Sequence, residues 1–191
     1  MTQNKITRSP DGLINEKEYK FTPDGFVDWR AMIDPQFLYP NKDFFEIRKL
    51  NIPNSIEGLE DKQLLIMLGG IKELARLRGF KSVRYTMNHI DTKYVVASCT
   101  IEWIGNFETS GESVVFEDVA NATEANADNF CLKFLETIAC NRAFVRCVRN
   151  FLNIHIVGAD EIDKSKNKAV DISDLVQSSV NGKLSCAVQH K

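Results

Sequence analysis

Long apolar segments are missing from the 191-residue sequence, in which no run approaches the roughly 20 residues that span a bilayer as a helix. The segment from Met1 to Lys20 is polar and charged, unlike the apolar centre of a secretory signal. Cysteines are few and odd in number, five in all, without a Cys-x-x-Cys pair or other metal-ligand spacing. These absences predict a cytoplasmic protein with reduced thiols and no metal site.

Motifs for nucleotide hydrolysis and metal catalysis are also missing. The sequence contains no Gly-x-x-x-x-Gly-Lys-[Ser/Thr] run, which argues against a P-loop ATPase, and its three histidines are far apart in the sequence. We therefore expect no cofactor, no catalytic residue and no enzymatic activity. One enzymatic alternative stays open, because Glu102, Glu117 and Asp118 could gather around a divalent ion as in an acidic nuclease. A solvated acidic surface is the preferred interpretation of these residues.

Proline is absent beyond Pro53, and all five prolines lie in residues 1–55 together with scattered aromatics. Because proline fixes the backbone and removes a hydrogen-bond donor, this composition predicts an N-terminal arm of short elements, a candidate to pack on a neighbouring subunit. After Asp160 the composition becomes polar and rich in Lys, Asp, Ser and Asn, which predicts a flexible tail over residues 163–191. The core domain is expected between these parts, at residues 56–162.

Three strands are predicted in the core domain. Residues 82–90 and 92–104 are rich in β-branched and aromatic residues and are separated at Asp91, which predicts a β-hairpin. Residues from about 112 to 119 complete a third strand. The sequence therefore predicts a three-stranded antiparallel sheet.

Helices are predicted on both sides of these strands. From Ile56 to Gly79 apolar residues recur every three or four positions, which predicts a helix broken at Gly69-Gly70 and capped by Gly79. A polar link at residues 121–128 leads into a long helix that ends near Asn153. The expected fold is α+β, with a helix, the antiparallel sheet and a long helix packed on that sheet, a β-β-β-α core.

Basic residues concentrate in two segments, although the net charge of −2 excludes binding of a polyanion by bulk attraction alone. The first segment contains Lys72, Arg76, Arg78, Lys81 and Arg84. The second contains Arg142, Arg146 and Arg149, whose i, i+4, i+7 spacing places them on one helix face, the arginine ridge. Arginine forks bind phosphate oxygens at two points, so both segments are candidate DNA-binding sites, with Tyr85 as a candidate to stack on bases.

Other interpretations of these residues stay open. Basic side chains near a helix C-terminus complement the helix dipole, and aromatics on strands, such as Tyr85, Tyr94 and Trp103, more often belong to the core. The arginines could also pair with a neighbouring subunit, since residues 108–128 carry only acidic charges. The ridge has no acidic residue within its own segment, so we expect it to lack local charge compensation.

Three runs in the last part of the core domain carry a family resemblance. They are Glu136 to Phe144 (ETIACNRAF), Arg149 to Ile154 (RNFLNI) and Gly158 to Ile162 (GADEI). The pattern resembles phage single-strand annealing proteins of the Erf and Sak type, which are similar in fold to the eukaryotic Rad-family annealing protein. The resemblance covers roughly residues 70–162, with Asn141 at a position where the family usually has glycine.

The resemblance implies binding of single-stranded DNA and annealing of complementary strands without ATP, in homologous recombination or repair. It also implies a homo-oligomer, either a ring or a helical filament, located in the host cytoplasm if the chain is encoded by a phage. The tail is a candidate contact for a single-strand binding protein. Two alternatives remain: a structural or assembly protein that uses the arginine ridge for subunit contacts, and a double-stranded-RNA-type binding module, whose last helix is normally shorter.

Overall fold

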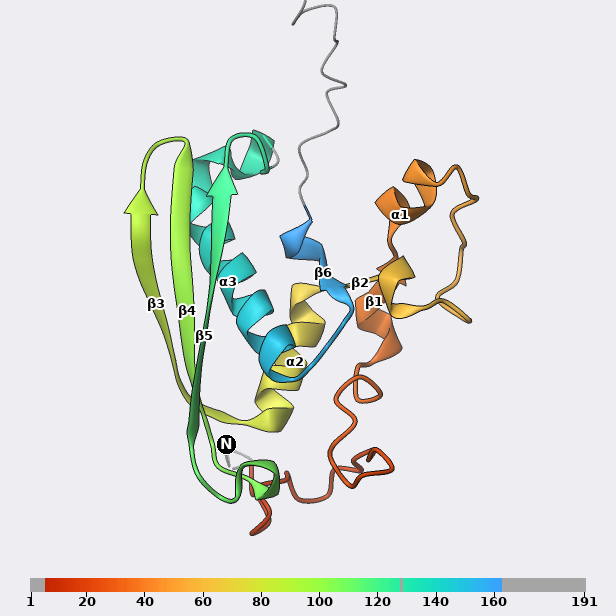
Figure 1. Cartoon of the computed structure of the whole chain (residues 1–191), viewed down its shortest axis with the longest axis vertical. Coiled ribbons are helices and arrows are strands. Elements are labelled where there is room, and N and C mark those ends of the chain that lie inside the picture. The colour runs from red at the N-terminus through yellow and green to blue at the C-terminus, as the bar shows by residue number, and fades with distance from the viewer. Residues whose placement is uncertain (1–5, 128, 163–191) are drawn as a thin grey trace, which may run out of the picture.

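The computed structural model describes residues 6–127 and 129–162, so the predicted tail at residues 163–191 lies outside the described residues. Its largest sheet is antiparallel with the strand order β3 (Phe80–Ile90), β4 (Tyr94–Trp103) and β5 (Val114–Thr123). Helix α3 (Leu135–Phe151) packs along one face of this sheet (Figure 1). The α+β fold with a long helix on a three-stranded sheet is confirmed.

Alternating burial of side chains along β4 explains how the sheet packs against α3. Every second residue of β4 is buried toward α3, and these residues are Val95, Ala97, Cys99, Ile101 and Trp103. The residues between them face away from α3, so the sheet has one apolar face and one more polar face. The indole of Trp103 stacks on the ring of Phe151 near the end of α3, with a centroid distance of 4.5 Å.

The predicted hairpin at Asp91 is confirmed. The Asp91 carboxylate accepts hydrogen bonds from the Lys93 backbone N–H at 3.0 Å and from the Thr92 hydroxyl at 3.2 Å. These bonds close the turn between β3 and β4 and lower the pKa of Asp91, the backbone bond being the largest cause. The carboxylate therefore specifies the turn locally.

Two predicted element boundaries are wrong. Strand β5 continues to Thr123 because Thr123 and Asn126 exchange hydrogen bonds between backbone N–H groups and side-chain oxygens, which ends the strand in a turn. A 3₁₀ segment at Asn129–Phe134 then precedes α3, so the long helix starts at Leu135 instead of within the polar link. A turn of this kind competes with helix formation at polar residues.

The single helix predicted from Ile56 to Gly79 is also wrong in its first half. Residues Leu64–Ile66 form strand β2, and α2 (Leu68–Arg78) begins after it, with Gly69 and Gly70 inside its first turn. All three residues of β2 are buried, so its apolar run has no period that distinguishes it from a helix. The predicted C-cap at Gly79, which has φ of 82°, is confirmed.

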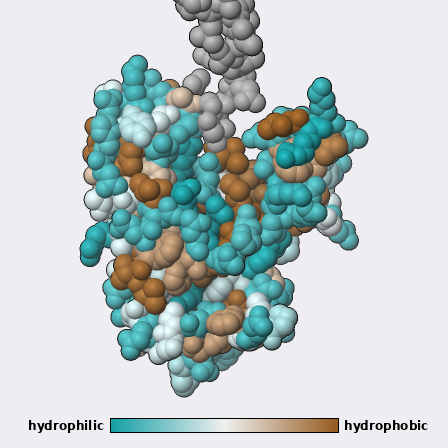
Figure 2. Space-filling model, in the orientation of Figure 1, coloured by the Kyte–Doolittle hydropathy of each residue, from teal (hydrophilic) through white to brown (hydrophobic). Residues whose placement is uncertain are grey.

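A second, smaller sheet pairs two short strands that precede α2 with one strand that follows α3. Its order is β1 (Leu38–Pro40), β2 and β6 (Val157–Gly158), with β1 antiparallel and β6 parallel to β2. Helix α1 (Lys42–Ile47) extends from this sheet to one side of the molecule, and hydrophobic surface lies over it in Figure 2.

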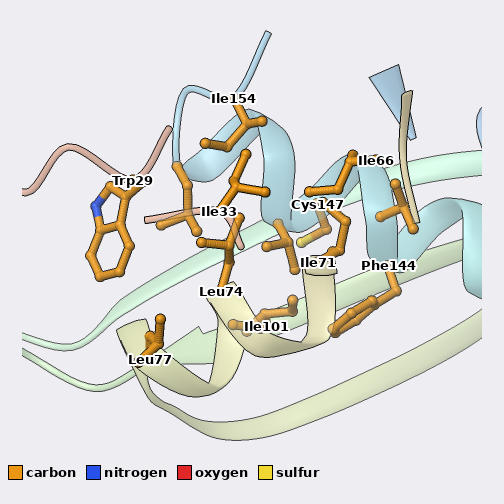
Figure 3. Packing of buried hydrophobic residues seen from close by; sticks show 14 of the residues in the cluster. Trp29, Ile33, Ile66, Ile71, Leu74, Leu77, Ile101, Phe144, Cys147 and Ile154 are labelled. Atoms are coloured by element: carbon orange, nitrogen blue, oxygen red, sulfur yellow. The ribbon is translucent and has the colours of Figure 1, made fainter. Parts of the chain in front are cut away.

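The N-terminal arm is part of the main core. Trp29 and Ile33 are buried against α2 and the segment after α3, beside Leu74 and Ile154 (Figure 3). Arg8 donates hydrogen bonds to the carbonyls of Arg76 at 3.0 Å and of Leu77 at 3.1 Å, which caps the end of α2. The boundary predicted near residue 55 therefore does not separate two hydrophobic cores. Among the described residues, no helix combines the length and the hydrophobicity needed to cross a membrane.

Replacing Trp29 by alanine should lower the free energy of unfolding by about 3–5 kcal/mol, because a large buried side chain is lost from the core. Phe26→Ala is the matched control, since Phe26 is 54% exposed, and should change stability by no more than about 0.5 kcal/mol. Urea denaturation of both variants measures the difference. Equal stabilities would contradict the placement of the arm in the core.

Candidate functional site

The arginine ridge lies on one face of α3, as its spacing predicts, but this face is turned toward β5 and the 3₁₀ turn Ala159–Glu161. Arg142 is only 6% exposed. Its Nε donates to the Asp160 carbonyl at 2.6 Å, Nη1 to the Asn121 carbonyl at 3.0 Å and to Asn126 Oδ1 at 2.7 Å, and Nη2 to the Asn126 carbonyl at 2.6 Å. Arg142 therefore joins three segments of the chain, and its small exposed part lines the cavity described below.

Arg149 is also engaged within the protein. Its guanidinium binds Glu161 at two points, 2.6 and 3.0 Å, and also donates to the Ile154 carbonyl at 2.8 Å. The Glu161 carboxylate accepts a further bond from the Gly158 backbone N–H at 2.9 Å. This buried ion pair holds the last described turn against α3.

Arg146 is the one member of the ridge with a large solvent-exposed part, 44% of its side chain. Its Nε lies 3.2 Å from Asp118 of β5, and its Nη1 lies 4.0 Å from Glu161. Asp118 and Glu161 are distant from the ridge in the sequence, so the expectation that the ridge lacks charge compensation is wrong. Nη2 of Arg146 has no hydrogen-bond partner among the described residues.

The side chains of the first basic segment differ in their exposure and in their partners. Lys72 and Arg76 are exposed on α2, where Arg76 pairs with Glu73 at 2.8 Å. Arg78 is 2% exposed and donates to the carbonyl of Ile104 at 2.6 Å. Burial is the main cause that lowers the pKa of Arg78. The basic side chains of the first segment therefore do not share one environment, since Arg78 is buried while Lys72 and Arg76 are exposed.

Lys81, Arg84 and Tyr85 all belong to β3 but divide between its two faces. Lys81 pairs with Glu102 at 3.2 Å, and Arg84 lies opposite Thr100, both on the face away from α3. Tyr85 lies opposite Cys99 on the α3 side and is 43% exposed. Partial burial is the main cause that raises the pKa of Tyr85 to about 12.

The face of the β3-β4-β5 sheet that points away from α3, the outer face, carries no described helix (Figure 1). Near the β3–β4 turn it presents the rings of His89 and Tyr94, whose centroids are 5.4 Å apart. Tyr94 is 41% exposed. Acidic side chains lie farther along this face, where Glu102 pairs with Lys81 and Glu117 accepts a hydrogen bond from Thr100 at 2.6 Å.

A cavity of about 390 Å³ lies where the outer face meets the exposed edge of β5. Its walls combine an aromatic ring, aliphatic side chains, amides, the guanidinium groups of Arg142 and Arg146 and the carboxylate of Glu161. The lining residues used below are Tyr94, Val96, Val119, Asn121 and Arg146. A planar ring could lie against Tyr94 while an anionic group reaches Arg146.

The acidic residues considered for a nuclease do not form a common site. Glu117 and Asp118 are neighbours on β5 and point to opposite faces of the sheet: Glu117 contacts Thr100, and Asp118 contacts Arg146. Within the described ranges, no group of three His, Cys, Asp or Glu side chains is arranged to hold a metal ion. The nuclease alternative therefore lacks its expected geometry.

The sequence pattern identifies Tyr94 only as an aromatic residue on a strand and does not single out Asn121. No spacing in the sequence links Tyr94, Asn121 and Arg146, because they come from β4, β5 and α3. In comparisons with known proteins, no family model matches the sequence, and neither a curated protein nor a solved structure matches it.

Arg142→Ala should lower the free energy of unfolding by about 3 kcal/mol or more, because the carbonyls of Asn121, Asn126 and Asp160 lose a charged donor. Arg142→Lys should recover only part of this loss, since an ammonium group lacks the planar fork. The control Arg146→Ala should cost less than about 1 kcal/mol. Chemical denaturation compares the three variants, and equal losses for both alanine variants would contradict the structural role of Arg142.

Proposed function

We propose that this protein binds single-stranded DNA and anneals complementary strands without ATP, as a homo-oligomer acting in recombination or repair. The observation that carries the proposal is the cavity at the edge of the outer face, which brings the ring of Tyr94 and the guanidinium of Arg146 to one place. Stacking on an aromatic ring and charge contact with phosphate are the two elements of sequence-independent binding to single strands.

Tyr94 and Arg146 have complementary roles in the proposed binding. The half-exposed ring of Tyr94 supports a base by stacking, beside the small aliphatic side chain of Val96. The free Nη2 of Arg146 binds a phosphate oxygen, while Nε stays bonded to Asp118. The ion pair with Asp118 orients the guanidinium, so less side-chain entropy is lost on binding.

The exposed outer face supports annealing as well as binding. Phosphate contacts hold a strand in place without reading its sequence, and an uncovered sheet leaves room for a second strand. Arg84 adds a cation to the same face, because it lies on the outer face of the exposed strand β3, opposite Thr100.

A structural or assembly role that uses the arginine ridge for subunit contacts has less support. Such a role needs arginines that are free to pair with a neighbour, whereas Arg149 pairs with Glu161 and Arg146 with Asp118 of the same chain. An acidic neighbour would have to displace these internal carboxylates.

Fluorescence anisotropy with a labelled oligo-dT strand tests the binding site. Tyr94→Ala should weaken binding by about 1–3 kcal/mol through lost stacking. Arg146→Ala should weaken binding and reduce the slope of log affinity against log salt by up to about 0.7 for one lost phosphate contact.

The matched control for Arg146→Ala is Arg48→Ala. Arg48 lies beside α1, with its guanidinium 3.9 Å from the Phe44 ring centroid and outside the cavity lining, so its removal should leave the salt slope unchanged. Equal slopes for wild type and Arg146→Ala would reject the cavity as the DNA site. Stronger binding of double-stranded RNA than of oligo-dT would favour the RNA-binding alternative.

Annealing is tested separately with two complementary oligonucleotides, one carrying a fluorophore and the other a quencher, in buffer without ATP. The wild-type protein should accelerate quenching, and Tyr94→Ala should lose most of the acceleration, because the strand is no longer held by stacking. Binding without acceleration would restrict the function to single-strand binding. An absence of binding at low salt would overturn the whole proposal.

A further inference from the structure

The two outer edges of the β3-β4-β5 sheet differ in how their backbone groups are occupied. On β5, the Val119 N–H donates to Asp118 Oδ1 at 2.7 Å, the Asn121 carbonyl accepts from Arg142 at 3.0 Å, and the Thr123 N–H donates to Asn126 Oδ1 at 2.8 Å. Side chains therefore block this half of the β5 edge.

These contacts also show which residues of β3 direct backbone groups outward. In an antiparallel sheet, alternate residues of a strand bond to opposite neighbours. On β5, the backbone N–H and C=O groups of Val119, Asn121 and Thr123 point away from β4. The backbone groups of the residues between them therefore bond to β4. Following the register across β4, the backbone groups of Val83, Tyr85 and Met87 point to the free edge of β3. Among the described residues, none of these groups has a hydrogen-bond partner.

The side chains of the same three residues are incompletely covered. They lie on the α3 side of the sheet, where Val83 is half-buried, Tyr85 is 43% exposed and Met87 is 37% exposed. Helix α3 makes its main contacts with β4 and β5, which leaves β3 at the uncovered side of the sheet (Figure 1). The edge of β3 thus combines unpaired backbone groups with exposed apolar side chains, the two features of a strand-docking site.

We propose that β3 pairs with β3 of a second copy of this chain, antiparallel and about a two-fold axis at Tyr85. This register is self-complementary, because Val83 lies opposite Met87 of the second copy and Tyr85 opposite its own equivalent. It forms about six backbone hydrogen bonds. Arg84 lies opposite Thr86 of the second copy, so like charges do not face each other at the centre.

The blocked edge of β5 is the reason for a closed dimer. A ring or filament built by continuing the sheet would need β5 of one copy to pair with β3 of the next, and side chains already occupy half of that edge. A two-fold contact uses β3 alone and closes after two copies. This inference does not depend on DNA binding.

The molar mass of the full-length chain, measured by sedimentation equilibrium across a wide range of concentrations, should be that of a dimer. Met87→Pro removes an outward N–H in each copy and leaves the bonds to β4 in place. It should raise the dissociation constant of the dimer by roughly ten- to a hundredfold, as expected for two lost backbone hydrogen bonds. Val115→Pro is the matched control, since Val115 also directs its N–H outward but lies on β5, and it should leave the dimer intact.

A cysteine crosslink keeps the test decisive if Met87→Pro fails to fold. Tyr85→Cys should form a disulfide-linked dimer under mild oxidation, because directly opposed residues have Cα atoms about 5.5 Å apart, within the disulfide range. Two controls should give little crosslinked dimer: the wild type and Val115→Cys. Val115 is 64% exposed, so a cysteine there is accessible to oxidation but lies on β5. A monomeric wild type would overturn the proposal. So would a larger assembly that Met87→Pro leaves unchanged. Crosslinking of Val115→Cys as efficient as that of Tyr85→Cys would also contradict it.

Discussion

Arg142 connects the end of β5, the turn at Asn126 and the segment at Asp160 through one buried guanidinium. Burying a charged group is costly unless its donors are bonded, so these three segments have to lie together around it. The same contacts set where α3 lies along β5 and where the chain runs after β6. The rest of the core depends on this arrangement, since α3 supplies much of its apolar surface.

Charge compensation follows from that arrangement. With α3 fixed against β5, Asp118 comes within reach of Arg146, and Glu161 comes within reach of Arg149. A basic helix face thereby becomes an internal network with one partly exposed member. The cavity at the edge of the outer face, and not the helix face itself, is the surface open to a ligand. Arg146 lines it together with Tyr94 and Asn121.

The long helix and the hairpin could be predicted because their signals are local. The spacing of apolar residues in α3 and the carboxylate of Asp91 act within a few residues. Strand β2 could not be predicted, because Leu64, Leu65 and Ile66 are buried together and show no alternation. The late start of α3 was missed because the turn formed by Thr123 and Asn126 competes with a helix.

The sequence by itself determined the α+β class, the order of the main strands and the alignment of three arginines on one helix face, because these depend on periodicity along the chain. Only the tertiary structure decided which arginines are buried, which carboxylates neutralise them and which sheet edge stays free. Those outcomes depend on residues such as Asp118 and Glu161, which are distant in the sequence and meet the arginines only when the sheet, α3 and β6 pack together.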